Sequence, residues 1–408
     1  MRLLKEKNGE SIFNTFYIGV LYALITVALN SDLSSSRILW WGVVLLFVAT
    51  SSYLQMKKYR DFKFDKTYLI WSGLFFGICI ASIFWAQSTS FAMGAIKSML
   101  IHFVIFVLLL SSIKNTNDIK ILLAIVLAAS LTNAIYLMLQ NPDILIGGTE
   151  IGASRLGDSD GWNSNSIGMM TAVSSLIGLS FYGKTKNRVN RLAVIAAIVF
   201  LVFVSFVTGS RKAVIIVMIG IMLYIPMKAR KRKITAFVFA VFVAIMAFYL
   251  IMNIPYFYNI VGWRIDAFLS QYTGSGSLDG SAEHRKILIS SAIDTWEQYP
   301  ILGCGMNCFR IFGEIATGRE YYAHNNYVEI LADLGIVGFI SYYWGFAYLL
   351  VKLWKLRNSE DVSKILLVII LIILIMGYAC VHYNDFLFEI LIMLAFSHIN
   401  LSQKTYKT

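Results

Sequence analysis

Charged residues are scarce in this chain, and their scarcity excludes a soluble globular protein. Asp, Glu, Lys and Arg make up 14% of the 408 residues, whereas 58% are hydrophobic; an average soluble protein is about 25% charged. Cysteine is scarce too, and four cysteines do not make a disulfide framework. The only close pair, Cys304 and Cys308, lacks the second pair that a zinc site needs. We therefore expect an integral membrane protein without a structural metal.

Long apolar runs account for most of the chain. A spanning helix needs about 20 mostly apolar residues, and twelve stretches approach that length: residues 12–29, 38–54, 68–86, 92–112, 119–139, 166–182, 191–208, 212–227, 234–252, 327–351, 365–380 and 384–402. No repeat, low-complexity tract or soluble domain interrupts them. The pattern predicts an all-α polytopic protein in which residues 1–408 form one membrane domain. The first run has no A-x-A site behind it, so we expect no cleavable signal peptide.

The net charge of +12 could suggest a nucleic-acid partner, but most basic residues lie in every second loop between the apolar runs. Cytoplasmic loops of membrane proteins are enriched in Lys and Arg. This alternation predicts that both termini are cytoplasmic and that the basic loops face membrane lipid, with no nucleic-acid partner. It leaves two long loops outside, residues 140–165 and 253–326.

A smaller group of basic residues falls on the outer side, where the same rule leaves few. Each of them is therefore a candidate for function. They are Arg37, Lys97, Arg155, Arg211, Lys212, Arg264, Arg285, Lys286, Arg310 and Arg319.

The loop 253–326 contains an expected amphipathic helix at residues 283–299, which Pro300 ends. We expect Ile289, Ala292, Ile293 and Trp296 to share its apolar face. One interpretation is that the helix rests on the bundle surface. The other is that the same helix also holds Arg285 over a cavity, and the two interpretations are compatible. A glycine-punctuated turn, GCGMNCF, follows it.

Three motifs occur in a fixed order: TGSRKA at 208–213, Glu-His-Arg at 283–285 followed by W-x-x-Y-P-I-L-G-x-G, and HNNYVEILADLGIVG at 324–338. Over about residues 190–345 they resemble the O-antigen ligase / Wzy-type polysaccharide polymerase superfamily. The resemblance implies a GT-C-like fold in the bacterial cytoplasmic membrane, with its active site facing outward. It also implies inverting transfer of a glycan from undecaprenyl pyrophosphate to an acceptor hydroxyl, without a metal, nucleotide or other cofactor.

By the same resemblance, Arg211 and Arg285 match the arginines that bind the donor pyrophosphate, and His324 matches the histidine that acts on the acceptor. The chemistry of these side chains agrees. Guanidinium groups grip phosphate oxygens bidentately and stay charged, and an imidazole suits the removal of a hydroxyl proton. The alternatives are structural: Arg211 capping a helix or reaching lipid phosphate, and Arg285 pairing with a neighbouring carboxylate.

Four further residues are expected to bind substrate. Arg155 belongs to an R-x-G…N-x-N…G stretch that resembles one found in superfamily members. In those proteins the stretch is a turn that leads into the next span. Lys97 lies in an apolar run, where a charge is often functional, although it could reach the outer surface. Asn325 follows His324 but could simply cap a helix. His382 lies in the last outer turn and could line the same cavity.

A D-x-D sequence, Asp158-Ser159-Asp160, is the one candidate ligand pair for a divalent ion. Gly157 and Gly161 flank it, which favours a polar turn. We interpret it as a turn and expect a metal-independent site.

Polymerase and ligase activities share the donor and differ in the acceptor. No motif in this sequence indicates which acceptor is used. The motifs S-R-K-A and H-N-N-Y-V-E look most like those of repeat-unit polymerases of O-antigen or capsule. A polymerase would have a chain-length regulator as a possible further partner. The ligase alternative transfers polymer to a lipid A-core sugar. A lipid-linked oligosaccharide flippase is the alternative of another class, but it would show repeated halves and charges near the membrane midplane.

Overall fold

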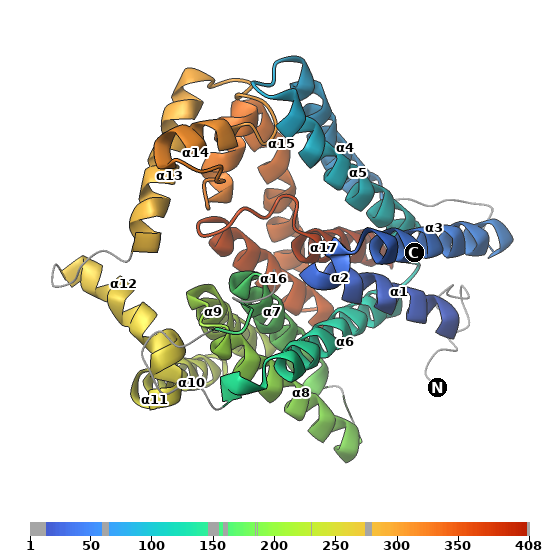
Figure 1. Cartoon of the computed structure of the whole chain (residues 1–408). Coiled ribbons are helices and arrows are strands. Elements are labelled where there is room, and N and C mark those ends of the chain that lie inside the picture. Colours follow the sequence, from blue (N-terminus) through green and yellow to red (C-terminus); the bar gives the residue numbers. More distant parts are fainter. Residues whose placement is uncertain are drawn as a thin grey trace.

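The computed structural model describes residues 14–58, 65–145, 155–157, 162–183, 185, 187–229, 231–273 and 280–405. Within these residues the chain is helical and has no strand (Figure 1). Every predicted apolar run is a helix: α1 (Thr15–Ala28), α3 (Arg37–Lys58), α4 (Lys66–Ala81), α5 (Thr89–Ser112), α6 (Thr116–Gln140), α7 (Ser164–Tyr182), α8 (Arg188–Val207), α9 (Arg211–Lys228), α10 (Lys233–Asn253), α15 (Asn326–Leu356), α16 (Asp361–Gly377) and α17 (Phe386–Thr405). The predicted all-α polytopic fold is confirmed.

Eight of these helices are long and apolar enough to cross a membrane, counted over the described residues. The other four, α1, α7, α9 and α16, are shorter or more polar. Both α7 and α16 are buried along almost their whole length. Such helices are surrounded by protein, so they can be shorter or more polar than helices that face lipid.

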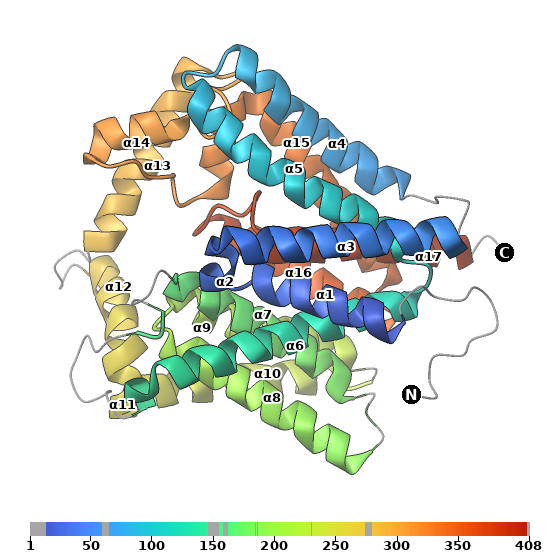
Figure 2. The same cartoon turned by 45° about the vertical axis from the view of Figure 1, so that its right-hand side comes forward.

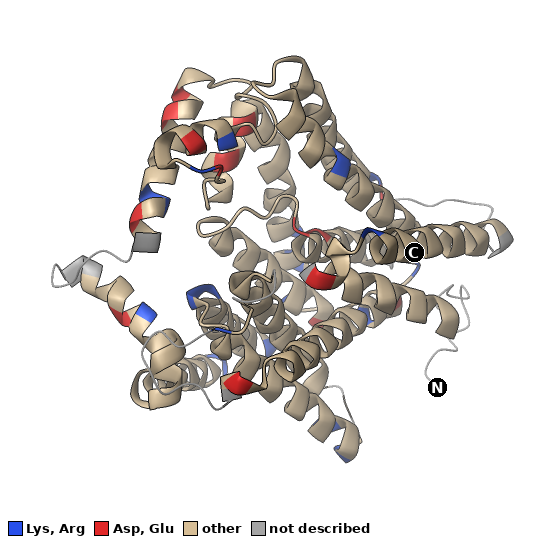
Figure 3. Cartoon of the chain, viewed as in Figure 1, with Lys and Arg blue, Asp and Glu red and all other residues tan. Residues whose placement is uncertain are grey.

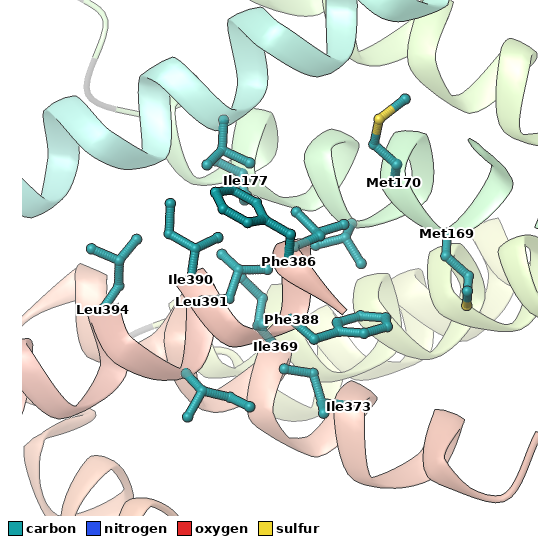
Figure 4. Packing of buried hydrophobic residues seen from close by; sticks show 14 of the residues in the cluster. Met169, Met170, Ile177, Ile369, Ile373, Phe386, Phe388, Ile390, Leu391 and Leu394 are labelled. Carbon is teal, nitrogen blue, oxygen red and sulfur yellow. The ribbon is translucent and has the colours of Figure 1, made fainter. Parts of the chain in front are cut away.

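The centre of the bundle is built from α7, α16 and α17. Figure 4 shows Met169 and Ile177 of α7 packed with Ile369 of α16 and Phe388 of α17. Small residues let α9 approach this centre closely, as is common in membrane bundles. A Cβ on Gly220 of α9, for example, would overlap the Leu176 side chain of α7.

The apolar surface of the protein lies on the outer helices. Large side chains on α8 and α10, such as Leu192, Val199, Phe239 and Ile245, are exposed. Water-soluble proteins rarely expose apolar patches of this extent. These helices therefore form a lipid-facing surface, and the chain is a multi-pass membrane protein.

The loops gather on two opposite faces of the bundle (Figure 2). We call one the α13 face; it comprises residues 82–88, 142–145, 155–157, 208–210, 254–273, 280–325 and 378–385. Backbone hydrogen bonds join its segments: Gln87 N–H donates to Cys304 O over 2.9 Å and Leu156 N–H to Val207 O over 3.4 Å. On the opposite face the Ser402 hydroxyl donates to Glu360 Oε1 over 3.2 Å. The loops that the charge pattern predicts to be external thus lie together.

The α13 face is predicted to be extracytoplasmic, and cysteine labelling tests this orientation. Glu297 on α13 and Arg188 at the start of α8 are both exposed. We expect a membrane-impermeant maleimide to label Glu297→Cys in intact cells and to label Arg188→Cys only after the membrane is opened. The native cysteines in the described residues are buried and free, so they give little background. Labelling of position 188 in intact cells would reverse the topology.

The loop 253–326 is mostly helical, beyond the one helix expected. It contains α11 (Pro255–Phe257), a π-helical turn at Tyr258–Gly262, α12 (Trp263–Thr273), α13 (Gly280–Gln298) and α14 (Phe309–Thr317). Short elements also occur elsewhere, namely α2 (Ser31–Ser35) and 3₁₀ turns at Ser82–Phe84 and Pro142–Leu145.

The amphipathic helix is present as α13, but its buried face differs from the predicted one. Leu288 and Ala292 are buried against Phe309 of α14, against Ala323 in the segment before α15, and against Ala332 of α15. The predicted face comprised Ile289, Ala292, Ile293 and Trp296. Of these Ala292 is buried, but Ile293 is exposed, so the predicted face is displaced by about one position. The partners that select the buried side are distant in sequence, so periodicity alone could not identify them.

The turn after α13 is inserted into a break in α15. Gly335 interrupts that helix with φ 61° and ψ −164°, a conformation essentially restricted to glycine. Ile336 N–H donates to Pro300 O over 3.0 Å, and Cys304 N–H donates to Ala332 O over 2.8 Å. Asp333 Oδ1 accepts from Phe309 N–H over 2.8 Å at the start of α14. These bonds fix α13 and α14 relative to the beginning of α15.

Substitution of Gly335 by alanine should prevent this docking. A Cβ there would overlap the backbone of Ile301 and Leu302, in addition to the roughly 1–2 kcal/mol that a left-handed φ costs any other residue. We expect a loss of more than about 4 kcal/mol, the range of severe single substitutions, seen as loss of monodisperse protein in detergent. Gly318 is the matched control: its φ is 78° but a Cβ there meets open space. Equal behaviour of Gly318→Ala and Gly335→Ala would contradict the docking argument.

Candidate functional site

Arg211 begins α9 directly after a tight turn. Gly209 has φ 61° in this turn, and Ser210 precedes the helix in an extended conformation. The half-buried Arg211 guanidinium donates from Nη1 to Arg264 O over 3.3 Å and lies 5.5 Å from the centre of the Phe268 ring. These contacts hold the side chain against α12 at the α13 face, and its binding to pyrophosphate stays a prediction.

The R-x-G…N-x-N…G stretch braces that turn. A Cβ on Gly209 would lie 2.7 Å from Cδ of Arg155, so the Arg155 side chain crosses the turn directly. Asn165 Oδ1 accepts from the Ser210 hydroxyl over 3.1 Å. A Cβ on Gly168 would lie 2.7 Å from Thr208 Oγ1, so only glycine lets α7 approach the turn this closely. The stretch therefore positions Arg211, and contact of Arg155 with substrate stays a prediction.

Arg211, Lys212 and Arg285 form a cluster of cations. Lys212 is only 7% exposed, and it feels the charges of both Arg211 and Arg285. Its ammonium makes no hydrogen bond or ion pair with the part of the chain that the structure describes. Figure 3 shows basic residues at the start of α9 and on α12 and α13, all on the α13 face. A buried charge without an ionic partner is costly, so this cluster is suited to an anionic ligand.

His324 lies beside these cations, in the segment just before α15. Its backbone is left-handed, with φ 55°, so it precedes the helix and does not begin it. Its Nδ1 atom is buried and accepts no hydrogen bond from the described residues, and its ring lies 4.2 Å from the Tyr322 ring, centre to centre. Burial lowers the pKa of His324 to about 3, and the charges of Arg285 and Lys212 add to that effect. The imidazole is therefore neutral at physiological pH.

The two asparagines after His324 have structural roles. Asn325 caps α15, its side-chain oxygen accepting from Tyr327 N–H over 2.9 Å. Asn326 Oδ1 accepts from the backbone N–H of His382 over 2.9 Å and of Tyr383 over 3.2 Å. Asn326 thus ties the His324 segment to the turn 378–385. The structure thus supports the capping alternative for Asn325, and its contact with substrate stays a prediction.

The other two predicted substrate-binding residues lie away from this cluster. Lys97 is exposed on α5. His382 is buried, with its Nδ1 3.2 Å from the Tyr342 hydroxyl, and burial lowers its pKa to about 3. Its Nε2 points toward Gly377, so it packs within the bundle instead of facing the cations. Asp158-Ser159-Asp160 lies outside the described residues, and the expected metal independence stays a prediction.

Sequence reasoning missed two residues at this site. Lys212 was only one of several external basic residues, although its position next to Arg211 was a usable signal. Tyr322 gave no signal, because a tyrosine in a polar loop is unremarkable until the fold brings its ring onto His324.

The fold and this cluster define a multi-pass membrane protein with converging cations beside a neutral histidine. A family model described as O-antigen ligase matches residues 196–343, which include Arg211, Arg285 and His324. This part of the chain is similar to the O-antigen ligase / Wzy superfamily, and the resemblance predicted from the motifs is confirmed. The family implies a glycosyltransferase-like ligase or polymerase activity. No curated protein matches the chain.

Proposed function

We propose that the protein polymerises undecaprenyl-pyrophosphate-linked oligosaccharide repeat units into a surface polysaccharide. The transfer would be inverting and metal-independent, on the outer face of the bacterial cytoplasmic membrane. The observation that carries this proposal is the cluster of Arg211, Lys212 and Arg285, because it brings the charges of Lys212 and Arg285 close to a neutral base, His324.

The proposed reaction uses each part of this cluster. The acceptor hydroxyl oxygen attacks the anomeric carbon of the donor glycan, and the bond from that carbon to the pyrophosphate oxygen breaks. The leaving pyrophosphate gains negative charge, which Arg211, Lys212 and Arg285 stabilise. The proton of the attacking hydroxyl passes to the His324 imidazole and then to water.

Donor binding should strengthen the base. In the free protein, burial and the two neighbouring cations hold the pKa of His324 down. Bound pyrophosphate adds negative charge beside the same cations and offsets them, which raises the pKa of His324 again. The imidazole thus becomes more basic only once the donor is in place, so the acceptor is deprotonated with a leaving group present.

The pH dependence of transfer should reflect this difference. An ordinary histidine is half protonated near pH 6.5, whereas His324 of the free protein stays neutral down to a pKa of about 3. We therefore expect kcat/KM, which reports the free enzyme, to stay flat from pH 8 to well below 6.5. The acid limb of kcat, which reports the donor complex, should lie at higher pH. Initial rates at subsaturating and saturating donor measure both profiles. An acid limb of kcat/KM near pH 6.5 would contradict the assigned environment.

Gel analysis of turnover by the purified protein tests the proposed function. The protein would be supplied with its own lipid-linked repeat unit and EDTA, without any divalent ion. A ladder of products spaced by one repeat unit is the expected result. No ladder with EDTA, but a ladder after a divalent ion is restored, would make the reaction metal-dependent.

Ligase activity is the second candidate, because the matching family model carries that description. The same assay separates the two activities. A ligase would build no ladder from repeat units alone, but would attach preformed lipid-linked polymer to an added lipid A-core acceptor.

A further inference from the structure

A second polar feature of the α13 face is a cavity of about 520 Å³ beside the His324 segment. Its walls come from α5, from α14 with the turn before it, from the beginning of α15, and from the turn 378–385. This volume is within the range of small-ligand pockets, about 300–1,000 Å³. The mechanism above assigns nothing to this space.

The walls present hydrogen-bonding groups that lack a complete set of partners. Glu329 is fully buried; one of its oxygens accepts from Ala323 N–H, while Oε1 has no partner among the described residues. Asn384 Oδ1 is likewise unpartnered within the described chain. Arg310 donates from Nε to Asn307 Oδ1 over 2.8 Å. Unsatisfied buried oxygens are costly, so these groups are suited to a ligand rich in hydroxyls.

The cavity adjoins the predicted base. Tyr322 lines it, and the same ring lies 4.2 Å from the His324 ring, centre to centre. Glu329, also in the wall, holds the backbone of Ala323 between these two residues. A ligand in the cavity can therefore present a group to His324 from the side of Tyr322, while the cations act on His324 from α9 and α13.

We propose that this cavity binds the sugar of the acceptor glycan whose hydroxyl His324 deprotonates. Its walls differ from the donor site: the carboxyl groups of Glu329 and Asp385 line it, and Arg310 is the one cation among the residues of these walls. The same groups and Asn384 Oδ1 accept hydrogen bonds from neutral hydroxyls, and Arg310 donates them. The inference rests on the proposed glycosyl transfer, since it assigns the acceptor of that reaction.

Filling the cavity without removing any polar group is the direct test. Gly94 of α5 lines the cavity, and a Cβ built there meets open space, so Gly94→Phe can be accommodated. Gly42 of α3 is exposed and also has open space around a Cβ, so Gly42→Phe is the matched control. Asn384→Ala is the second variant, because it removes one wall acceptor and adds no bulk.

The probe is the free oligosaccharide released from the native lipid-linked repeat unit by mild acid. It keeps its non-reducing end and can serve as a soluble acceptor. We expect Gly94→Phe to raise the apparent KM of this oligosaccharide by about tenfold or more, and Asn384→Ala by about two- to tenfold, the effect of one hydrogen bond. The KM of the lipid-linked donor should stay unchanged in both, and Gly42→Phe should match the wild type.

Two results would overturn the assignment: an unchanged acceptor KM in Gly94→Phe, or a rise confined to the donor KM. Equilibrium dialysis of the fluorescently labelled oligosaccharide separates this inference from the proposed function. If the wild type binds the oligosaccharide, and Gly94→Phe does not, the cavity assignment stands even when no transfer occurs. Failure of transfer alone would refute only the glycosyltransferase proposal.

Discussion

Replacing Arg285 by lysine should lower the rate of glycan transfer about a hundred- to a thousandfold, the usual effect of losing one contact to a developing negative charge. Lysine keeps the positive charge but loses the planar fork that binds two phosphate oxygens at once. The same argument applies to Arg211→Lys, whose guanidinium is held between Arg264 O and the Phe268 ring. Single-turnover transfer from labelled lipid-linked repeat unit gives the rate.

Lys286 supplies the control for Arg285. It is the next residue on α13 and is exposed, so Lys286→Ala removes a cation from the same turn without touching the cluster. We expect its rate to stay within a few-fold of the wild type. If Lys286→Ala and Arg285→Lys lose the same activity, the loss is not specific to the guanidinium of Arg285, and the pyrophosphate assignment fails.

Removal of the His324 imidazole should cost about a hundred- to ten-thousandfold in transfer rate, the usual range for general-base catalysis. His324 has φ 55°, which alanine adopts poorly, whereas asparagine tolerates it better. His324→Asn therefore removes the base with little backbone strain, and His324→Ala reports the two effects together. Both variants should be measured with thermal unfolding in detergent alongside the rate.

His284 is the matched histidine control. It lies on α13 with its ring 4.8 Å from that of Tyr321, centre to centre, and it adds to the positive surroundings of His324. His284→Ala should retain most of the activity, because the His284 side chain is near the base His324 but does not itself act on the acceptor. Full activity of His324→Asn at normal expression would show that another group accepts the proton.

The helices of the bundle could be predicted because membrane insertion leaves a strong local signal. Each apolar run is long, and the basic loops alternate, so spans and faces follow from composition. The α13 helix was found for a similar reason, since Pro300 marks its end. Its buried side was missed by one position, because α14 and Ala323 select that side and neither is near it in sequence.

The site was predicted less completely, since it depends on contacts between distant segments. The motifs located Arg211, Arg285 and His324. In the structure Lys212 feels the charges of both arginines, and the neutral His324 feels those of Arg285 and Lys212. In the sequence, Gly335 is only one more glycine within a predicted helix. In the structure it breaks α15 at the place where the turn after α13 docks. The cavity at Glu329 and Asn384 joins α5, α14, α15 and the last turn, and no local pattern could indicate it.

The affinity of the purified protein for its lipid-linked donor tests the central claim, namely that the arginines bind pyrophosphate and His324 serves the acceptor. The dissociation constant should be measured for the wild type, Arg285→Lys and His324→Asn in the same detergent, with EDTA present. The account predicts weaker donor binding, by about tenfold or more, in Arg285→Lys, because hydrogen bonds between charged groups contribute about 1.5–3 kcal/mol. It predicts near-normal donor binding in His324→Asn, whose transfer rate nevertheless collapses. Weak donor binding by His324→Asn together with normal binding by Arg285→Lys would contradict the account.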